Sequence, residues 1–218
     1  MSVDPVIETT DHIARLHQRI VEEISIQGWS VIDDYMDDDD IRELCLQAEN
    51  HYLKRDMFQA GVGRSSQYRV NREIRSDHVL WLQSRTDNSP LGRYFQHLET
   101  LKTTLNRNLF LGLFDLECHM AVYPVGARYA RHLDCFQGTS LRTLTCILYL
   151  NRDWKAEQGG QLRIYTGLDT GRGHVDILPR GGQLIAFLSD RFEHEVLPTR
   201  RRRASISGWF RKRPIQAI

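Results

Sequence analysis

Three side chains in this sequence have the types and spacing of a non-haem iron site. His132 and Asp134 form an H-x-D pair, and His194 stands alone much further along the chain. On an extended segment, residues i and i+2 project from the same face, so both members of the pair can reach one ion. Two imidazoles and one carboxylate on one face of Fe(II) leave its other positions open for substrate and oxygen. We therefore predict an Fe(II) site, with His194 contributed by a second strand.

A second chemical signal follows His194 along the chain. In residues 203–210, strand alternation puts Arg203, Ser205 and Trp209 on one face. A guanidinium on an inward face needs an anion, because a buried charge without a partner is costly. The dicarboxylate 2-oxoglutarate fits, since its 2-oxo acid can chelate iron while its distal carboxylate pairs with Arg203. The order of metal ligands and anion anchor therefore predicts an enzyme that uses Fe(II), 2-oxoglutarate and O2.

The segments around these side chains resemble a known family. Residues 116–210 are similar to the prolyl hydroxylase branch of the Fe(II)/2-oxoglutarate dioxygenases, above all to the oxygen-sensing hydroxylases that act on hypoxia-inducible factor. The resemblance suggests a bacterial member of that branch. It is carried by residues 120–124, 126, 129–134, 145–154, 159–164, 187–191 and 194–198, with a weaker match over 72–81.

The resemblance implies roles for further side chains. Tyr149 would join Arg203 on the distal carboxylate of 2-oxoglutarate, Tyr123 would stand near its metal-chelating end, and Trp209 would form a wall beside the iron. Any one of these aromatic residues alone is more often core filling, but their shared face with Arg203 favours the site. Contacts with a peptide substrate are implied for Arg75, Asp77, Trp81 and Arg131.

The segment 59–81 corresponds to a loop that folds over the peptide substrate in the resembled family. Arg75 and Asp77 match an ion pair of that loop, and Trp81 matches an aromatic residue behind it. The alternative is an ordinary exposed loop whose ion pair contributes little to stability. The lid interpretation is favoured, because long structureless loops in compact domains are usually functional.

The pattern of apolar residues predicts an α+β fold that is mainly β. From residue 112 onward, short alternating stretches broken by Gly, Pro and Asp predict a double-stranded β-helix, or jelly roll. Upstream we expect a helix capped at residues 10–11, an edge strand over 29–33, a helix after the acidic run 37–40, and a helix beginning at 89–90. We expect one domain over 1–218, with a helical buttress and lid in 1–111 and the jelly-roll catalytic core in 112–213.

Composition narrows the class of protein. The formal net charge of the 218 residues is +1, which argues against a general nucleic-acid binder. The four cysteines lack C-x-x-C spacing, so they predict neither a zinc site nor a disulfide framework, and free thiols fit a reducing cytoplasm. No segment approaches the roughly 20 apolar residues of a membrane span. We expect a cytoplasmic protein without a nucleic-acid or membrane partner.

The resemblance implies 4-hydroxylation of a prolyl residue in a protein, with release of succinate and carbon dioxide. Bacterial members of the branch act on elongation factor Tu, so a proline-containing loop of that protein is a candidate substrate, and ascorbate is a candidate accessory reductant. Two alternatives stay open: oxidation of another residue type or a small molecule, and a jelly-roll binding module without turnover. The module is disfavoured, because it need not retain His132, Asp134, His194 and Arg203 together.

Three features depart from the pattern or stand outside it. The turn between Tyr123 and His132 is one residue shorter than in the animal sensors, which puts the position of Tyr123 in doubt. His119 falls where those relatives carry an apolar pocket residue. It either tunes oxygen reactivity or is a satisfied pocket histidine, and the second interpretation is favoured. The basic runs 200–203 and 211–213 predict solvated faces, with attraction of an acidic protein partner as the alternative.

Overall fold

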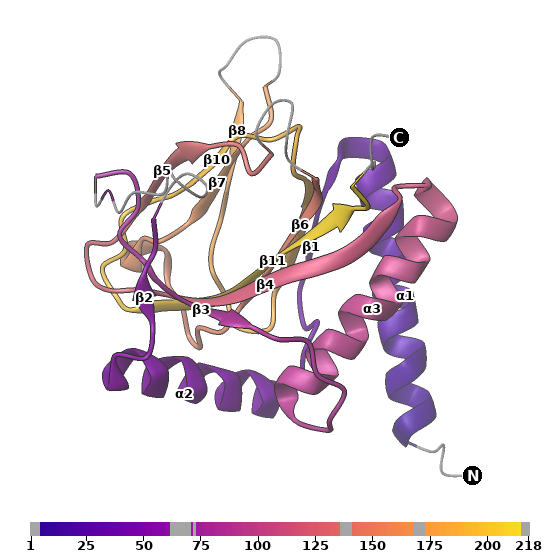
Figure 1. Ribbon diagram of the computed structural model, residues 1–218, viewed down its shortest axis with the longest axis horizontal. Coiled ribbons are helices and arrows are strands. Elements are labelled where there is room, and N and C mark those ends of the chain that lie inside the picture. Colours follow the sequence, from indigo (N-terminus) through magenta and orange to yellow (C-terminus); the bar gives the residue numbers. More distant parts are fainter. Residues whose placement is uncertain (1–4, 62–70, 72, 136–140, 168–172, 215–218) are drawn as a thin grey trace.

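A computed structural model describes residues 5–61, 71, 73–135, 141–167 and 173–214 of the chain, with side chains from residue 11 onward. Within these residues the strands form two antiparallel sheets, with the smaller sheet above the larger one in Figure 1. The larger sheet has the order β1 (Trp29–Ile32), β9 (Leu184–Leu188), β6 (Arg142–Tyr149), β11 (Arg203–Lys212), β4 (Leu113–Tyr123), β3 (His78–Leu82) and β2 (Phe58–Gln59). The smaller sheet has the order β5 (Tyr129–His132), β10 (His194–Val196), β7 (Leu162–Tyr165) and β8 (His174–Ile177). This arrangement confirms the predicted jelly roll, including the edge strand β1.

Strand alternation divides the residues of the larger sheet between two cores. On β6, Cys146 and Leu148 join a cluster with the helices, whereas Ile147 and Tyr149 join a second cluster between the two sheets. On β11, Ile206 packs on the helix side in the same way. The face predicted to carry the site therefore looks toward the smaller sheet. The short 3-10 helix Ala156–Gln158 connects β6 to β7.

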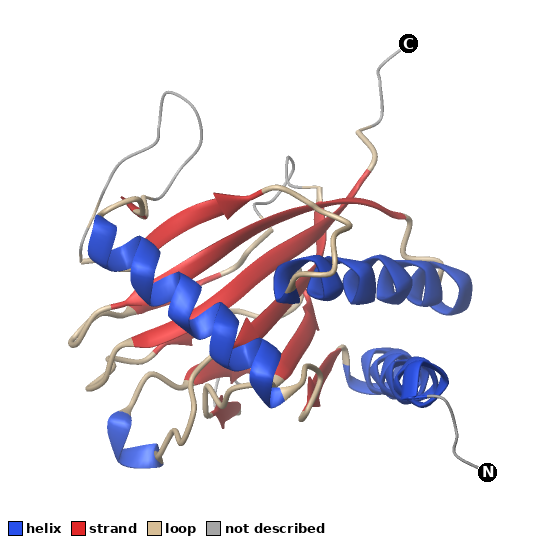
Figure 2. Cartoon of the chain, turned by 90° about the horizontal axis from the view of Figure 1, so that it is seen from below, coloured by secondary structure: helices blue, strands red, loops and turns tan. Residues whose placement is uncertain are grey.

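Three helices cover the outer face of the larger sheet (Figure 2). They are α1 (Pro5–Gln27), α2 (Asp38–Lys54) and α3 (Pro90–Leu109). The predicted start of α3 is confirmed, because the Ser89 hydroxyl accepts a hydrogen bond from the Gly92 N–H at 3.1 Å and proline follows at the first position. The predicted cap of the first helix at residues 10–11 is wrong. That helix already begins at Pro5, a residue type suited to a first turn, and it ends before Gly28, whose φ of 86° is the left-handed conformation typical after a helix.

The acidic start of α2 is only partly solvated. Asp38 and Asp39 are exposed in its first turn, where they complement the helix dipole as predicted. Asp40 is buried and accepts a hydrogen bond from Arg93 Nε of α3 at 2.8 Å. This pair therefore links the two helices that support the larger sheet.

The remaining compositional expectations concern cysteines and membranes. Cys45, Cys118 and Cys146 carry free thiols. None of the helices in the described part of the chain is long and apolar enough to cross a bilayer.

His17 gives the helical buttress a predictable dependence on pH. It is buried on α1, where Nε2 lies 3.0 Å from the Tyr35 hydroxyl. Burial, and then the neighbouring His97, lower the pKa of His17 to about 4 from its usual 6.5. Above pH 6.5 the residue is neutral in both folded and unfolded chains. Between pH 6.5 and pH 4, His17 binds a proton in the unfolded chain but not in the folded chain, so stability falls as pH falls.

We expect this linkage to account for about 2 kcal/mol of the stability lost between pH 7 and pH 5. The substitution His17→Gln keeps a hydrogen-bonding group for Tyr35 but cannot titrate, so it should reduce that loss by about the same amount. Chemical denaturation at the two pH values measures it. His12→Gln, which changes an exposed histidine of the same helix, is the control. An equal pH dependence in all three proteins would contradict the assignment.

Candidate active site

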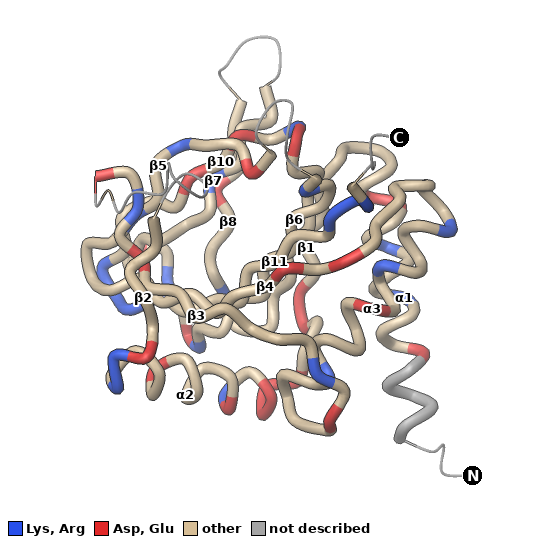
Figure 3. Tube along the Cα trace, in the orientation of Figure 1, with Lys and Arg blue, Asp and Glu red and all other residues tan. Residues whose placement is uncertain are grey.

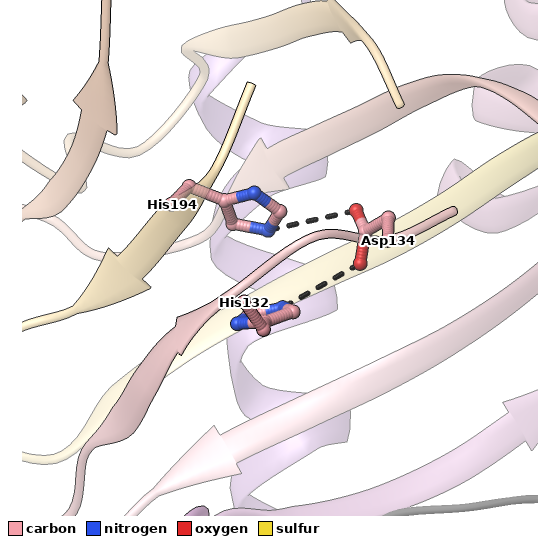
Figure 4. A group of neighbouring side chains, drawn as sticks. All are labelled: His132, Asp134 and His194. Carbon is pink, nitrogen blue, oxygen red and sulfur yellow. Dashed lines mark ion pairs between the residues drawn. The ribbon is translucent and has the colours of Figure 1, made fainter. Parts of the chain in front are cut away.

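The three predicted metal ligands converge between the two sheets. His132 is the last residue of β5 and His194 is the first residue of β10, and they face one another directly in the antiparallel register. Asp134 follows β5, with one carboxylate oxygen 3.5 Å from His132 Nε2 and the other 3.5 Å from His194 Nε2 (Figure 4). Among the described residues this is the one group of three His, Cys, Asp or Glu side chains whose ligand atoms all lie within 4.8 Å of one another. The donor set and its convergence fit Fe(II).

Backbone carbonyls orient both imidazoles. His132 Nδ1 lies 2.8 Å from the carbonyl oxygen of Ala130, and His194 Nδ1 lies 3.2 Å from that of Phe192. A neutral imidazole that donates its Nδ1–H to a carbonyl keeps the lone pair on Nε2. Both Nε2 atoms point toward Asp134, so the tautomers suit metal binding. Burial, and then the neighbouring His132, lower the pKa of His194 to about 4, so this ligand is neutral at physiological pH.

The Thr145 hydroxyl holds the carboxylate of Asp134 and is itself bonded to a second hydroxyl. Thr145 Oγ1 donates to Asp134 Oδ2 at 2.8 Å and also lies 2.9 Å from the Ser189 hydroxyl. Burial alone would raise the pKa of the Asp134 carboxyl, but His194 and His132 hold it well below its usual range. The carboxylate is therefore ionised and fixed in orientation before any ion binds.

We expect Thr145→Val to weaken Fe(II) binding by about 10- to 100-fold, because outer partners of metal ligands contribute on that scale. The substitution keeps the shape of the side chain and removes only the hydroxyl bound to Asp134. Anaerobic calorimetric titration with Fe(II) measures the change. Thr143→Val is the matched control, since the Thr143 hydroxyl donates to the carbonyl of Leu141 at 3.1 Å. Equal affinities in both variants would exclude a supporting role for Thr145.

Arg203 has the surroundings predicted for an anion anchor. It is 1% exposed, and its Nε donates to the carbonyl oxygen of Gly160 at 3.0 Å. Its Nη1 lies 3.4 Å from the Ser205 hydroxyl. Both of these partners among the described residues are uncharged, although a buried charge normally has an anionic partner. A dicarboxylate cosubstrate would supply the missing charge.

Two tyrosines flank this guanidinium. The Arg203 guanidinium carbon lies 4.9 Å from the ring centroids of both Tyr123 and Tyr149. The Tyr149 hydroxyl is enclosed and makes no hydrogen bond of normal geometry with any described residue, so it retains a donor for a ligand. Burial raises the pKa of Tyr149, while Arg203 opposes that shift. Tyr123 lies directly opposite Arg203 in the register and lines the cavity, so the shorter turn has not displaced it from the site face.

His119 of β4 and Trp209 of β11 line the cavity, and the Trp81 ring of β3 packs beside them without lining it. The Trp209 ring lies 5.2 Å from that of His119 and 6.5 Å from that of Trp81, between ring centroids. The Trp209 indole nitrogen has no hydrogen-bond partner of normal geometry within the described chain. The expectation of a satisfied pocket histidine is wrong, because His119 Nδ1 is enclosed and likewise has no partner there. Burial, and then Arg75, lower the pKa of His119 to about 3.

Arg75 and Asp77 form a buried pair rather than a surface one. Their two hydrogen bonds measure 2.8 and 2.6 Å, and Asp77 has no exposed surface. Burial alone would lower the pKa of Arg75, but Asp77 raises it. The guanidinium lies 4.3 Å from the ring centroid of Tyr129, and that ring stacks on His132 with centroids 3.7 Å apart. The Tyr129 ring therefore contacts both this pair and His132, a predicted metal ligand. Part of the predicted lid, residues 62–70 and 72, lies outside the described residues.

Arg131 is not brought into the cavity. Its Nε donates to the Glu193 carboxylate at 2.8 Å, and its guanidinium carbon lies 3.8 Å from the ring centroid of Tyr165. Arg131 and Glu193 are both exposed. Any contact of Arg131 with a substrate would therefore occur on the outer surface of the smaller sheet.

One arginine of each basic run pairs with acidic side chains. Figure 3 shows Lys and Arg interspersed with Asp and Glu along the chain. Arg211 bonds Asp115 at 2.6 Å and Glu117 at 3.1 Å, and Arg202 lies 3.8 Å from Glu49. These pairings favour the solvated-face interpretation over attraction of an acidic partner.

Several contributors to the site were not assigned from the sequence. Tyr129, Thr145 and Ser189 touch the ligands or their partners, and the carbonyls of Ala130 and Phe192 orient the imidazoles. Thr145 lies four residues before Tyr149 on β6, so strand alternation puts both on one face, and this was the available signal for its role. A backbone carbonyl leaves no such signal, because every residue has one. A larger hollow of about 300 Å³ between α2 and the end of β3 is lined by different residues and none of the ligand group.

The chain is similar to known proteins over most of its length. Residues 118–211 match the model of the 2OG-Fe(II) oxygenase superfamily. The chain is 28% identical over 205 residues to the hypoxia-inducible factor prolyl hydroxylase of Caenorhabditis elegans, covering 88% of this chain but only 28% of that protein's length.

Two solved structures are similar over nearly the whole fold. A prolyl-4-hydroxylase of Pseudomonas putida is 35% identical, with a TM-score of 0.82, and the match covers 90% of this chain and 100% of that one. A Trichoplax adhaerens prolyl hydroxylase, solved in complex with a peptide fragment of the hypoxia inducible factor oxygen degradation domain, is 25% identical with a TM-score of 0.82. That match covers 94% of this chain and 92% of the other.

Proposed function

Since the chain belongs to the 2OG-Fe(II) oxygenase superfamily, among its prolyl hydroxylases, we propose that it 4-hydroxylates a prolyl residue in a protein substrate. The observation that carries the proposal is one cavity that contains both the convergent ligands His132, Asp134 and His194 and the buried guanidinium of Arg203. Each feature alone occurs in other proteins. Their juxtaposition matches the two ends of 2-oxoglutarate.

The chain's own residues would hold and orient the reacting groups. His132, Asp134 and His194 would bind Fe(II), and Arg203, Tyr149 and Ser205 would fix the distal carboxylate of 2-oxoglutarate. Tyr123 would stand beside the cosubstrate and Trp209 beside the metal. Bound Fe(II) and 2-oxoglutarate supply the activation of O2, with succinate and carbon dioxide as products. The enclosed walls would exclude water from that chemistry.

The proposed substrate is a protein that presents a proline in a loop. The Trichoplax adhaerens prolyl hydroxylase was solved in complex with a peptide fragment, which supports a peptide as the chemical class. Elongation factor Tu is our candidate. The buried pair Arg75–Asp77, the exposed Trp81 and Arg131 are the proposed contacts with it.

Three further parts of the proposal concern organisation and setting. We propose that residues 1–218 act as one domain, with 1–111 as buttress and lid and 112–213 as catalytic core. Free cysteines support a cytoplasmic location. Ascorbate is the proposed accessory reductant.

Mass spectrometry of lysate proteins tests the function. The purified protein is incubated with lysate from the source cells, Fe(II) and 2-oxoglutarate, and peptides are searched for prolines that have gained one oxygen. We expect a specific proline to be modified by the wild-type protein and not by Asp134→Ala. Succinate formation without any oxidised proline would overturn the prolyl substrate and leave the oxygenase chemistry standing.

A further inference from the structure

Residues that pair across the central strands of the larger sheet form rows beneath the cavity. Arg203 and Tyr123 face one another across β11 and β4, at the end proposed for the distal carboxylate. Further along β11, another row crosses four strands from β3 to β6, in the order Trp81, His119, Ser207 and Ile147. His119 therefore stands away from the anion anchor, on the β3 side of the cavity.

The two ends of that row differ in exposure. Ile147 is buried and is backed by Ile185 of the neighbouring strand β9, which closes that end. Trp81 is 56% exposed, and its ring centroid lies 5.2 Å from that of His119. His119 thus lies toward the end of the row at which the outermost ring, Trp81, is exposed to solvent.

His119 is a polar side chain in need of a partner. It is 4% exposed and lies between the rings of Trp81 and Trp209, whose indole N–H groups are donors only. Its Nδ1 is fully enclosed without a hydrogen bond to any described residue, whereas Nε2 is not enclosed. Buried N–H groups without acceptors are rarer than unpaired acceptors. The neutral ring therefore carries its proton on Nε2, which remains available to a ligand in the cavity.

We infer that His119 donates this hydrogen bond to a backbone carbonyl oxygen of the substrate chain beside the target proline. The inference rests on the proposed function. The carboxylate and 2-oxo groups of 2-oxoglutarate are already assigned to Arg203 and the metal, so the peptide supplies the remaining acceptor. An X–Pro peptide bond has a carbonyl oxygen but no N–H, so a donor on the enzyme matches it and an acceptor would not. The contact would align the proline ring with the metal.

Two substitutions at this position separate hydrogen bonding from packing. His119→Met keeps a side chain of similar volume and removes the donor. His119→Gln carries an amide N–H₂ at about the position of Nε2. The iron-loaded full-length protein is assayed for succinate with 2-oxoglutarate alone and with increasing concentrations of lysate protein as substrate pool.

Succinate formed with 2-oxoglutarate alone is the baseline of each protein, against which its stimulation by lysate is measured. His119→Met should raise the lysate concentration needed for half-maximal stimulation about tenfold or more, because a buried carbonyl loses its donor. His119→Gln should restore it to within about threefold. The inference is overturned if the Met variant equals wild type, or if the Gln variant is as impaired as the Met variant. Wild-type succinate formation that no lysate protein stimulates would instead overturn the proposed function, and this assignment with it.

Discussion

Asp134→Ala is expected to lower turnover at least about 1,000-fold, because it removes the single anionic ligand of the proposed iron site and several kcal/mol of metal binding with it. Asp134 is also the residue on which both Nε2 atoms converge, at 3.5 Å each. The loss should therefore appear first as a failure to bind Fe(II). The visible charge-transfer absorption of the Fe(II)–2-oxoglutarate complex measures that binding independently of any substrate.

Asp176→Ala is the control for this substitution. Asp176 lies on β8 of the same smaller sheet and pairs with Arg163 at 2.7 Å, outside the cavity. We expect this variant to retain metal binding and turnover. That result would show that loss of any carboxylate from the smaller sheet does not by itself cause the defect of Asp134→Ala. Retention of the absorption band by Asp134→Ala would contradict the ligand assignment.

Arg203→Met is expected to raise the 2-oxoglutarate concentration needed for half-maximal turnover by about 100-fold. Charge-assisted hydrogen bonds contribute about 1.5–3 kcal/mol each, and two of them would be lost. The maximal rate should change less, since the metal ligands are untouched. Initial rates of succinate formation over a wide range of 2-oxoglutarate concentrations measure both quantities.

Although Arg203→Met should weaken cosubstrate binding, we do not expect it to lower the stability of the protein. An unpaired buried guanidinium is costly, so methionine should not lower the melting temperature in the absence of cosubstrate. The stabilisation that 2-oxoglutarate gives to the wild-type protein should disappear, because it depends on binding. Arg163→Met, at a partly exposed arginine of β7, is the control and should keep that stabilisation. A cosubstrate-induced shift of normal size in Arg203→Met would refute the anchor.

The parts of the molecule that local periodicity determines were predictable from the sequence. Alternation by two along β11 fixes that Arg203 and Ser205 share a face, whatever the rest of the chain does. The helix start at Ser89 was predictable for the same reason, since a cap and a first-turn proline act within one turn.

Features that depend on distant pairings were not predictable in this way. The direct opposition of His194 and His132 follows from the register between β10 and β5, which two separate segments set together. The contact between Asp40 and Arg93 depends on the packing of two helices. That His119 Nδ1 has no hydrogen-bond partner among the described residues is likewise known only once its neighbours on β3 and β11 are in place.

The opposition of His132 and His194 has a consequence beyond chemistry. Strand β5 has four residues and lies at the edge of the smaller sheet, where β10 is its only strand neighbour among the described residues. An ion held by both histidines would act as a removable cross-link between segments far apart in the chain, and such links stabilise by closing a long loop. Iron supply would then set the resistance of this sheet to opening and proteolysis. The lifetime of the protein in the cell would thus depend on iron supply, as would its rate of turnover.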